Sequence, residues 1–187
     1  MLKLTSLDFY AAKMNAPQTE GAVPTYDTPQ RVCGTSRVNI AYNKTTNKVY
    51  ESGRAIYNKT HVADARVTLE SYTMALAKIK EFVLSLAADN RNEYIEGSIS
   101  DAPEEIAIGF AAMLSDGTYL CTWFYDASAV IPDENYQTSN ESGPQIEAES
   151  MEFSCVRRAG DNKLRRTKIC ADATAMAAFF ASVEPAA

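Results

Sequence analysis

The sequence predicts a mainly β protein, an antiparallel β-sandwich or barrel of about eight strands with one flanking α-helix. Short runs of β-branched and aromatic residues follow a period of two, and Gly, Pro, Asn and Asp separate these runs. Helical spacing dominates only one segment, which excludes a doubly wound α/β fold. The length of 187 residues suits a single domain covering residues 1–187.

The N-terminal third carries the most turn signals. Pro17, Pro24 and Pro29 interrupt it, because proline has no N–H group to contribute to the interior of a sheet. Around these breaks, Leu4–Ala11 and Arg31–Tyr42 predict strands.

The next segment, Asn43–His61, is polar and rich in Asn, Lys and Thr. Its Tyr50, Ile56 and Tyr57 provide only a weak strand signal. We interpret this segment, residues 43–61, as a long hairpin or loop that protrudes from the body.

The middle of the chain predicts a strand that runs directly into a helix. In Val62–Met74, Val67 and Leu69 alternate with polar residues, which indicates a strand with one buried face. Apolar residues then recur at helical spacing over Leu76–Leu86, and the helix is expected to end near Asp89. Its apolar stripe has to pack on a sheet.

The second half of the chain predicts a run of strands. Glu105–Leu114 and Thr118–Ala127 flank Asp116-Gly117, a strong signal for a hairpin turn. The aromatic density of the second strand predicts burial on both faces, and the polar loop Pro132–Pro144 is longer than most hairpin connections. Further along we expect strands at Ile146–Val156 and Leu164–Ala171, a turn at Ala159–Asn162 and, in the C-terminal segment 172–187, a short helix at Ala173–Val183 capped by Asp172 or Thr174.

Composition and charge exclude several classes of function. The net charge is −6, and an acidic surface repels nucleic acid because DNA affinity comes largely from Lys and Arg on phosphates. Thr5, Ser6 and Asp8 interrupt the apolar residues at the N-terminus, which argues against a signal peptide. No stretch reaches the roughly 18 apolar residues of a membrane span. We therefore expect folding in a cytoplasm and no membrane segment.

The four cysteines are Cys33, Cys121, Cys155 and Cys170. No two are close in sequence, so the spacings of zinc ribbons and thioredoxin-type motifs are absent. Each lies in a predicted strand, where a thiol packs as a small apolar side chain. We expect all four to be buried and reduced, as in other cytoplasmic proteins.

Residues suited to nucleophilic catalysis or metal binding are sparse. The single histidine, His61, lies in the polar segment, so a hydrolase would have to pair it with Cys121 or Cys155 across the fold. One His and scattered Cys provide no metal-ligand spacing. We interpret His61 as a surface residue.

Carboxylates and aromatic residues allow other chemistry in principle. The clusters Asp101/Glu104/Glu105 and Glu147/Glu149 could imitate the acids of a glycosidase, although acidic residues beside strands are usually solvated. No glycine-rich phosphate loop is present, and most aromatic residues fit the strand pattern of a core. The sequence predicts no enzyme, no cofactor and no metal site.

Charge changes sign between the last two predicted strands. Three interpretations stay open: neighbouring strands that neutralise each other across a hairpin, complementary surfaces on different copies of the chain, or a basic patch for DNA, which the nearby acids disfavour. Exposed pairs contribute only about 0.2–1 kcal/mol each, so specificity would be their main effect. The acidic residues are Asp133, Glu134, Glu141, Glu147, Glu149 and Glu152, and the basic ones are Arg157, Arg158, Lys163, Arg165, Arg166 and Lys168.

Several motifs follow one another in a characteristic order. A strand of the form IALGF corresponds to Ile106–Phe110, a D/N-G turn to Asp116-Gly117, a Y-x-W-x-Y strand to Tyr119–Tyr125, a P-x-x-x-Y-x-T loop to Pro132–Thr138 and an I/E-rich strand to Gln145–Val156. The strand and helix at Ala63–Leu86 and the segment Thr25–Pro29 fit the same order. In these motifs the chain resembles the major tail tube proteins of siphophages, specifically the phi13-type family.

The resemblance implies a structural subunit of a bacteriophage virion. Tail tube proteins form hexameric rings that stack into a hollow tube for the genome and a tape-measure protein, and their β-sandwich is related to the ring protein of type VI secretion. It implies assembly in the host cytoplasm, contacts with other tail proteins and passage of DNA without specific binding. On this basis the candidate subunit-interface residues are Tyr50, Ile56, Tyr57, Asp133, Glu134, Tyr136, Arg157, Arg158, Arg165 and Arg166.

Two alternatives stay open at this point. Another ring component of the tail, such as a terminator or a baseplate-hub relative, would share the fold but stop at one ring. A monomeric carbohydrate-binding β-sandwich would stay a single particle and be stabilised by its ligand.

Overall fold

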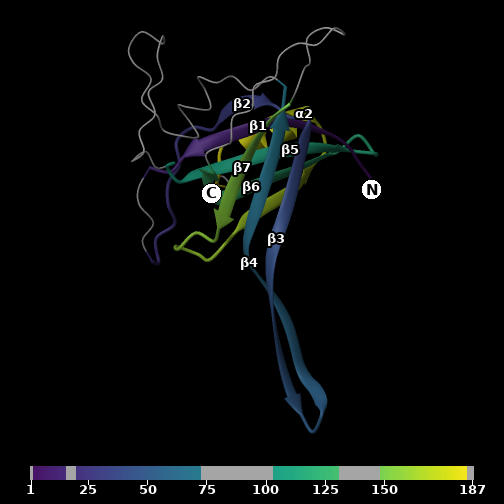
Figure 1. The fold of residues 1–187 in the computed structure, drawn as a ribbon. Helices are drawn as coiled ribbons and strands as arrows, with labels where there is room; N and C mark the ends of the chain where they lie inside the picture. Colours follow the sequence, from purple (N-terminus) through teal and green to yellow (C-terminus); the bar gives the residue numbers. More distant parts are fainter. Residues whose placement is uncertain (1, 16–19, 73–102, 131–147, 185–187) are drawn as a thin grey trace, which may run out of the picture.

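A computed structural model describes residues 2–15, 20–72, 103–130 and 148–184 (Figure 1). Over these residues the chain forms eight strands and one helix, which confirms the expected fold class, mainly β with one flanking helix. In chain order the elements are β1 (Lys3–Lys13), β2 (Gln30–Gly34), β3 (Arg37–Glu51), β4 (Arg54–Ser71), β5 (Ile106–Leu114), β6 (Tyr119–Val130), β7 (Glu149–Val156), β8 (Arg165–Cys170) and α2 (Ala173–Phe180).

The strands form one antiparallel sheet in the order β2-β1-β5-β6-β7-β4-β3. Strand β6 is its branch point, because β5 pairs along one edge while β8 and β7 share the other. β8 pairs with Tyr119–Phe124 and β7 with Asp126–Val130, so the two strands lie end to end along β6. Of the three interpretations of the charge reversal, the one in which the last two strands pair as a hairpin is therefore wrong.

The sheet curves so that its two halves face each other across a core. Phe9 of β1 and Phe153 of β7 are not on neighbouring strands, yet their ring centroids lie 5.5 Å apart. Val32, Val67 and Ile108 are buried in the same cluster. Period-two alternation places these residues on the inner face, and removing their apolar surface from water is the main source of stability.

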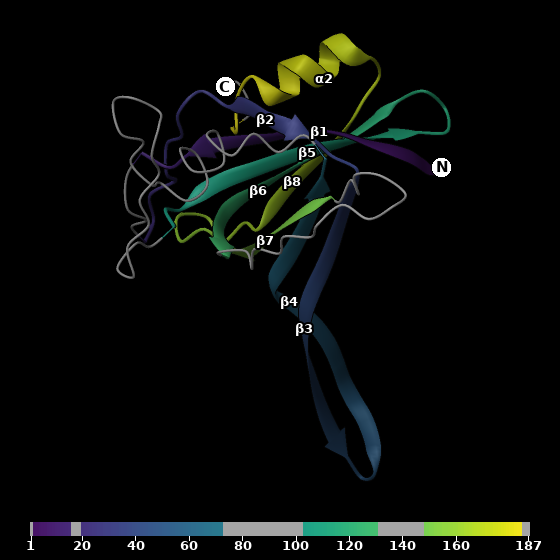
Figure 2. The same ribbon diagram turned by 45° about the horizontal axis from the view of Figure 1, so that its top comes forward.

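A second apolar cluster covers the outer face of the β1–β5–β6–β8 half. Here α2 lies across the strands (Figure 2), and Trp123 donates its Nε1–H to the Phe179 carbonyl oxygen at 3.3 Å. Gly109 lies opposite Trp123, where a Cβ would come within 2.7 Å of the indole ring. Asp172 accepts a hydrogen bond from the Ala175 N–H at 2.8 Å, which confirms it as the N-cap.

Strands β3 and β4 form a hairpin that extends well beyond the sheet (Figure 1). Its turn is at Ser52-Gly53, where both residues have positive φ angles of 49° and 77°. β4 pairs with β7 only over Ala65–Ser71. The segment Asn43–His61 is thus a two-stranded ribbon with register shifts after Asn43 and after Val49, which decides between the predicted hairpin and loop in favour of the hairpin.

Arg31–Tyr42 forms two strands and not the single predicted one. The strands are separated at Thr35 and Ser36, where the chain changes partner from β1 to β4. The Ser71 hydroxyl donates to the Gly34 carbonyl oxygen at 2.6 Å, and the Ser36 N–H donates to the Glu70 carbonyl oxygen at 2.8 Å. These bonds stabilise the change of partner. The predicted helix at 76–86, its end near 89 and the loop at 132–144 lie outside the described residues.

Candidate functional site

The projecting hairpin is a candidate site because its side chains lie in solvent. On β3, Val38, Ile40 and Tyr42 pack against the core, and the same face continues outward with Lys44. The apolar alternation that holds β3 on the body therefore ends at Tyr42. Beyond it, every residue of 43–61 whose exposure is described is exposed.

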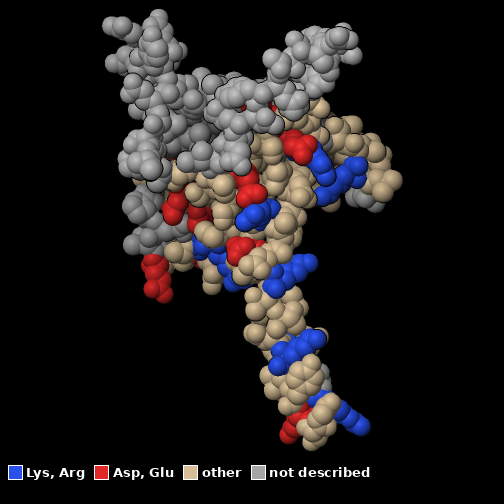
Figure 3. Space-filling view, in the orientation of Figure 1, with Lys and Arg blue, Asp and Glu red and all other residues tan. Residues whose placement is uncertain are grey.

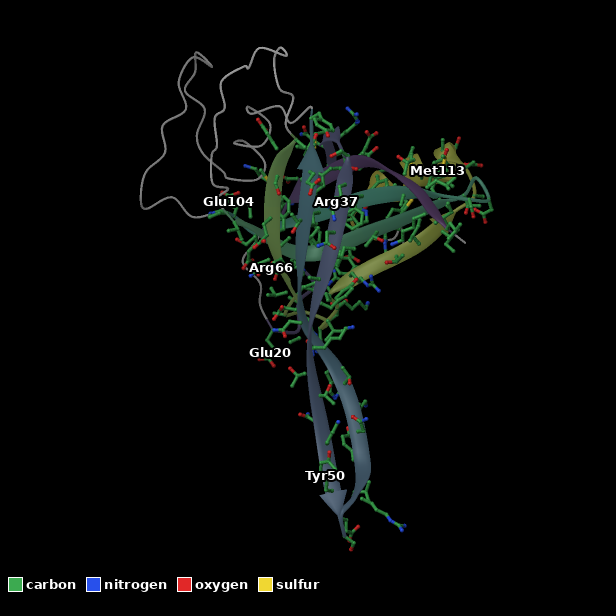
Figure 4. The ribbon with its side chains drawn as sticks, turned by 45° about the vertical axis from the view of Figure 1, so that its right-hand side comes forward. Glu20, Arg37, Tyr50, Arg66, Glu104 and Met113 are labelled. Carbon is green, nitrogen blue, oxygen red and sulfur yellow. The ribbon has the colours of Figure 1, made fainter. Side chains whose placement is uncertain are left out.

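Apolar side chains lie on both strands directly behind the charged turn Glu51–Arg54, and residues 49–57 are called the tip below. Val49 lies opposite Tyr57 and Tyr50 opposite Ala55, and Val49, Tyr50, Ile56 and Tyr57 are 51%, 63%, 61% and 46% exposed. Figure 4 shows Tyr50 near the end of the ribbon, far from the sheet. Exposed aromatic and aliphatic clusters of this kind mark interaction surfaces. The three predicted residues all lie in this segment, with Tyr50 and Tyr57 in different cross-strand pairs. Val49 was not predicted; a β-branched residue next to Tyr50 is the signal that could have identified it.

The shaft of the hairpin is basic. Within 43–61, Lys44, Lys48 and Lys59 lie on the shaft, and Arg54 lies at the turn with the one acidic residue, Glu51. The whole chain, in contrast, has 24 acidic and 18 basic residues. Figure 3 shows Lys and Arg spaced along the ribbon. The hairpin is thus opposite in charge to the rest of the molecule.

Two of the predicted arginines lie at the root of this hairpin. Arg157 donates a hydrogen bond to the Val62 carbonyl oxygen. Arg165 donates to the Tyr42 hydroxyl, and its guanidinium carbon lies 5.1 Å from the centroid of that ring. Together with Lys163, Arg165 also lines a concavity at this root. The fold therefore joins the basic segment after β7 to the base of the ribbon.

Arg158 occupies the interior, so its prediction as an interface residue is wrong. It is 1% exposed, its guanidinium lies 3.8 Å from the Tyr125 ring centroid, and its Nε is 2.6 Å from Asp161 Oδ1. Glu184 accepts a further bond from it. Burial opposes its charged form, but the hydrogen bonds that Arg158 donates to Asp161 and Glu184 outweigh burial and raise its pKa. In turn, Arg158 lowers the pKa of Asp161.

Arg166 contacts the C-terminal helix. Its guanidinium carbon lies 4.4 Å from the Phe179 ring centroid, and it donates to the Ser182 carbonyl oxygen at 3.4 Å. It therefore helps to hold α2 on the sheet. The remaining candidates Asp133, Glu134 and Tyr136 lie outside the described residues.

The sign change between the last two strands does not produce ion pairs between β7 and β8 among the described residues. Glu152 of β7 instead pairs with Arg66 of β4 at 3.2 Å, and Lys163 pairs with Asp161 at 2.9 Å within the following turn. Mutual neutralisation across a hairpin is thus wrong for the described part of both segments, because the strands lie end to end on β6.

The thiols are buried and free, as expected. Burial raises the pKa of Cys121 and that of Cys155 to about 12, so both stay protonated and weakly nucleophilic at neutral pH. His61 is exposed on the hairpin opposite Thr45. The Cys–His arrangement of a hydrolase is therefore not formed.

The described residues provide little else for chemistry. Glu104 pairs with Lys13 at 3.7 Å, at the side of the sheet, and Asp101 and Glu147 lie outside the description. Within that part of the chain, no group of His, Cys, Asp and Glu is placed to hold a metal ion. Helix α2, the one helix among the described residues, is too short to cross a membrane.

The chain matches no protein-family model and no curated protein.

Proposed function

We propose that the chain is a structural subunit of a bacteriophage tail tube, whose hexameric rings stack into a hollow conduit for DNA. The ribbon at 43–61 is the observation that carries the proposal. An isolated two-stranded hairpin is only marginally stable in water, and this one exposes an apolar tip. Contact with neighbouring copies would cover the tip and stabilise the ribbon.

The edges of the sheet support assembly as well. Among the described residues, β2 and β3 end the strand order, and each pairs there on one side only. Such edges offer unpaired N–H and C=O groups that a second chain can use to extend the sheet. Lys44 and Lys48 on β3 discourage unselective pairing, which favours docking in a defined register.

The charge of the chain suits a conduit. A net charge of −6 disfavours binding of phosphates, so genomic DNA would pass without being retained. Under this proposal the partners are further copies, the tape-measure protein and other tail proteins. Assembly takes place in the host cytoplasm, and the final location is the virion.

Negative-stain electron microscopy of the purified chain tests the proposal. Long tubes of uniform width are the expected result. Isolated rings would indicate a terminator or a hub relative instead. A single particle at every concentration would contradict the proposal and favour a monomeric binding module.

Removing most of the ribbon tests the role of the hairpin. Deletion of Thr45–Ile56 leaves five residues to connect Lys44 to Val62, which are neighbours across the ladder. No residue of either core cluster lies in the deleted segment, so the subunit should fold. We expect a cooperative thermal transition without tubes; normal tubes would refute a role for the hairpin in assembly.

A further inference from the structure

We infer that the tip of the hairpin docks into a concavity of a second copy of this chain, between Val23–Pro29 and Ala181–Glu184. This inference rests on the proposed function and names the surface that receives its hairpin. The concavity has a volume of about 400 Å³, within the range of about 300–1,000 Å³ for pockets that hold organic groups. Side chains the size of Tyr50 and Ile56 suit such a volume.

The walls of the concavity match the tip in chemistry. Val23, Pro24, Pro29 and Val183 give it an apolar lining, and Val23 is 46% exposed. An apolar tip covered by an apolar recess removes both surfaces from water. Tyrosine at the centre of such a contact commonly contributes a large share of the binding energy.

The walls are also held in place before any partner arrives. The Tyr26 hydroxyl donates to the Tyr125 carbonyl oxygen at 2.8 Å, and the Asp27 N–H donates to the Lys13 carbonyl oxygen at 2.9 Å. Arg158 donates a hydrogen bond to the Glu184 carboxylate, which lines the recess. A recess that is already ordered loses little conformational entropy on docking, which favours affinity.

The position of the recess identifies a second copy as the occupant. Ala181–Glu184 directly follow α2, and both views show α2 and the hairpin on opposite sides of the sheet (Figures 1 and 2). The ribbon points away from its own recess, so it reaches only the recess of another copy. That contact is head-to-tail and leaves one tip and one recess free, so it repeats along a stack.

Charge supports the same pairing. Asp27 and Glu184 line the recess, and none of its described lining residues is Lys or Arg. The hairpin brings four basic residues and one acidic residue. Opposite charge around an apolar contact speeds encounter and disfavours docking of tip on tip.

Directed cross-linking tests the contact in the assembled protein. Ser52→Cys combined with Thr28→Cys places one thiol at the turn of the hairpin and one on the wall of the recess without removing an apolar contact residue, and the native thiols are buried. Oxidised glutathione accepts the two electrons as a disulfide joins neighbouring copies. Ser52→Cys with Ser115→Cys, an exposed position at the β5–β6 turn, is the matched control.

We expect a ladder of cross-linked chains on denaturing gels from the first pair and none from the control. Tubes without a ladder, or an equal ladder from the control, would overturn the inference while leaving the proposed function intact. Absence of tubes and of ladders would contradict both.

Filling the recess provides an independent test. Val23→Trp should raise the concentration needed for tube formation about tenfold or more, whereas Val130→Trp, at a position of similar exposure (44%), should leave it unchanged. Thermal unfolding of both variants verifies that they fold. Assembly of Val23→Trp at the parental concentration would overturn the docking site, and failure of the parent chain to assemble would overturn the proposed function.

Discussion

The guanidinium of Arg158 lies against the Tyr125 ring, and carboxylates of Asp161 and Glu184 surround it. Removing this cation leaves Asp161 with only the exposed Lys163 as an ion-pair partner among the described residues and deprives Glu184 of its bond to Arg158. We expect Arg158→Met to lower the free energy of unfolding by about 2 kcal/mol, less than for a wholly buried pair because both acids reach solvent. Urea unfolding measures the loss. Lys168→Met at an exposed position should change stability by less than about 0.5 kcal/mol, and equal losses in the two variants would contradict this role.

Asp161 makes the same cluster sensitive to acid. Because its pKa in the folded chain lies below the ordinary value, mainly through the hydrogen bonds from Arg158, its contribution is fully present above the unfolded pKa of about 3.9. The contribution is lost as pH falls toward the folded pKa. We expect stability to decrease between pH 5 and pH 3, and Asp161→Asn to reduce that decrease. Urea titrations at the two pH values measure it, and identical slopes in both proteins would exclude Asp161.

At the scale of elements, two equally exposed tyrosines allow the effect of position on the hairpin to be distinguished from the effect of exposure. Tyr50 at its tip and Tyr72 after β4 are both 63% exposed. We expect Tyr50→Ser to slow tube formation at least several-fold, because it removes apolar area from the contact, and Tyr72→Ser to have little effect. Light scattering follows the assembly. Equal effects would show that exposure, and not position on the hairpin, determines the result.

Elements with local signals were predictable from the sequence. The Asp116-Gly117 turn between β5 and β6, the burial of β6 on both faces and the Asp172 cap of α2 follow from the chemistry of a few adjacent residues. The ribbon at 43–61 was predictable only as a hairpin or loop. Its polar residues weaken the strand signal, since alternation needs a buried face to appear.

Which strands pair with one another was not predictable from the sequence, because strand pairing depends on residues far apart in the chain. A period of two identifies β7 and β8 as strands, but it does not specify that both pair with β6 end to end. Arg158 was misplaced for a similar reason. Its sequence neighbours resemble a basic surface run, and only the fold brings Tyr125 and Glu184 around it.

At the scale of the molecule, a basic hairpin and an acidic remainder predict assembly that depends on salt. Raising NaCl from about 0.1 M to about 1 M shortens the Debye length from about 10 Å to about 3 Å and weakens steering between exposed charges. We expect the initial rate of tube formation to fall several-fold, as light scattering would show. Replacing Lys48 and Lys59 with Gln should reduce this dependence. A rate that rises with salt would indicate that apolar contact alone controls assembly.

The path of β4 has a mechanical consequence. One uninterrupted strand runs from the turn of the hairpin to Ser71, and its last residues pair with β7 from Ala65↔Cys155 to Ser71↔Glu149. A pull on the tip is directed along β4, so it loads the backbone hydrogen bonds between β4 and β7 in shear. These hydrogen bonds then resist the force together and do not break one after another. A subunit held by its hairpin would therefore transmit tension into the sheet without peeling apart.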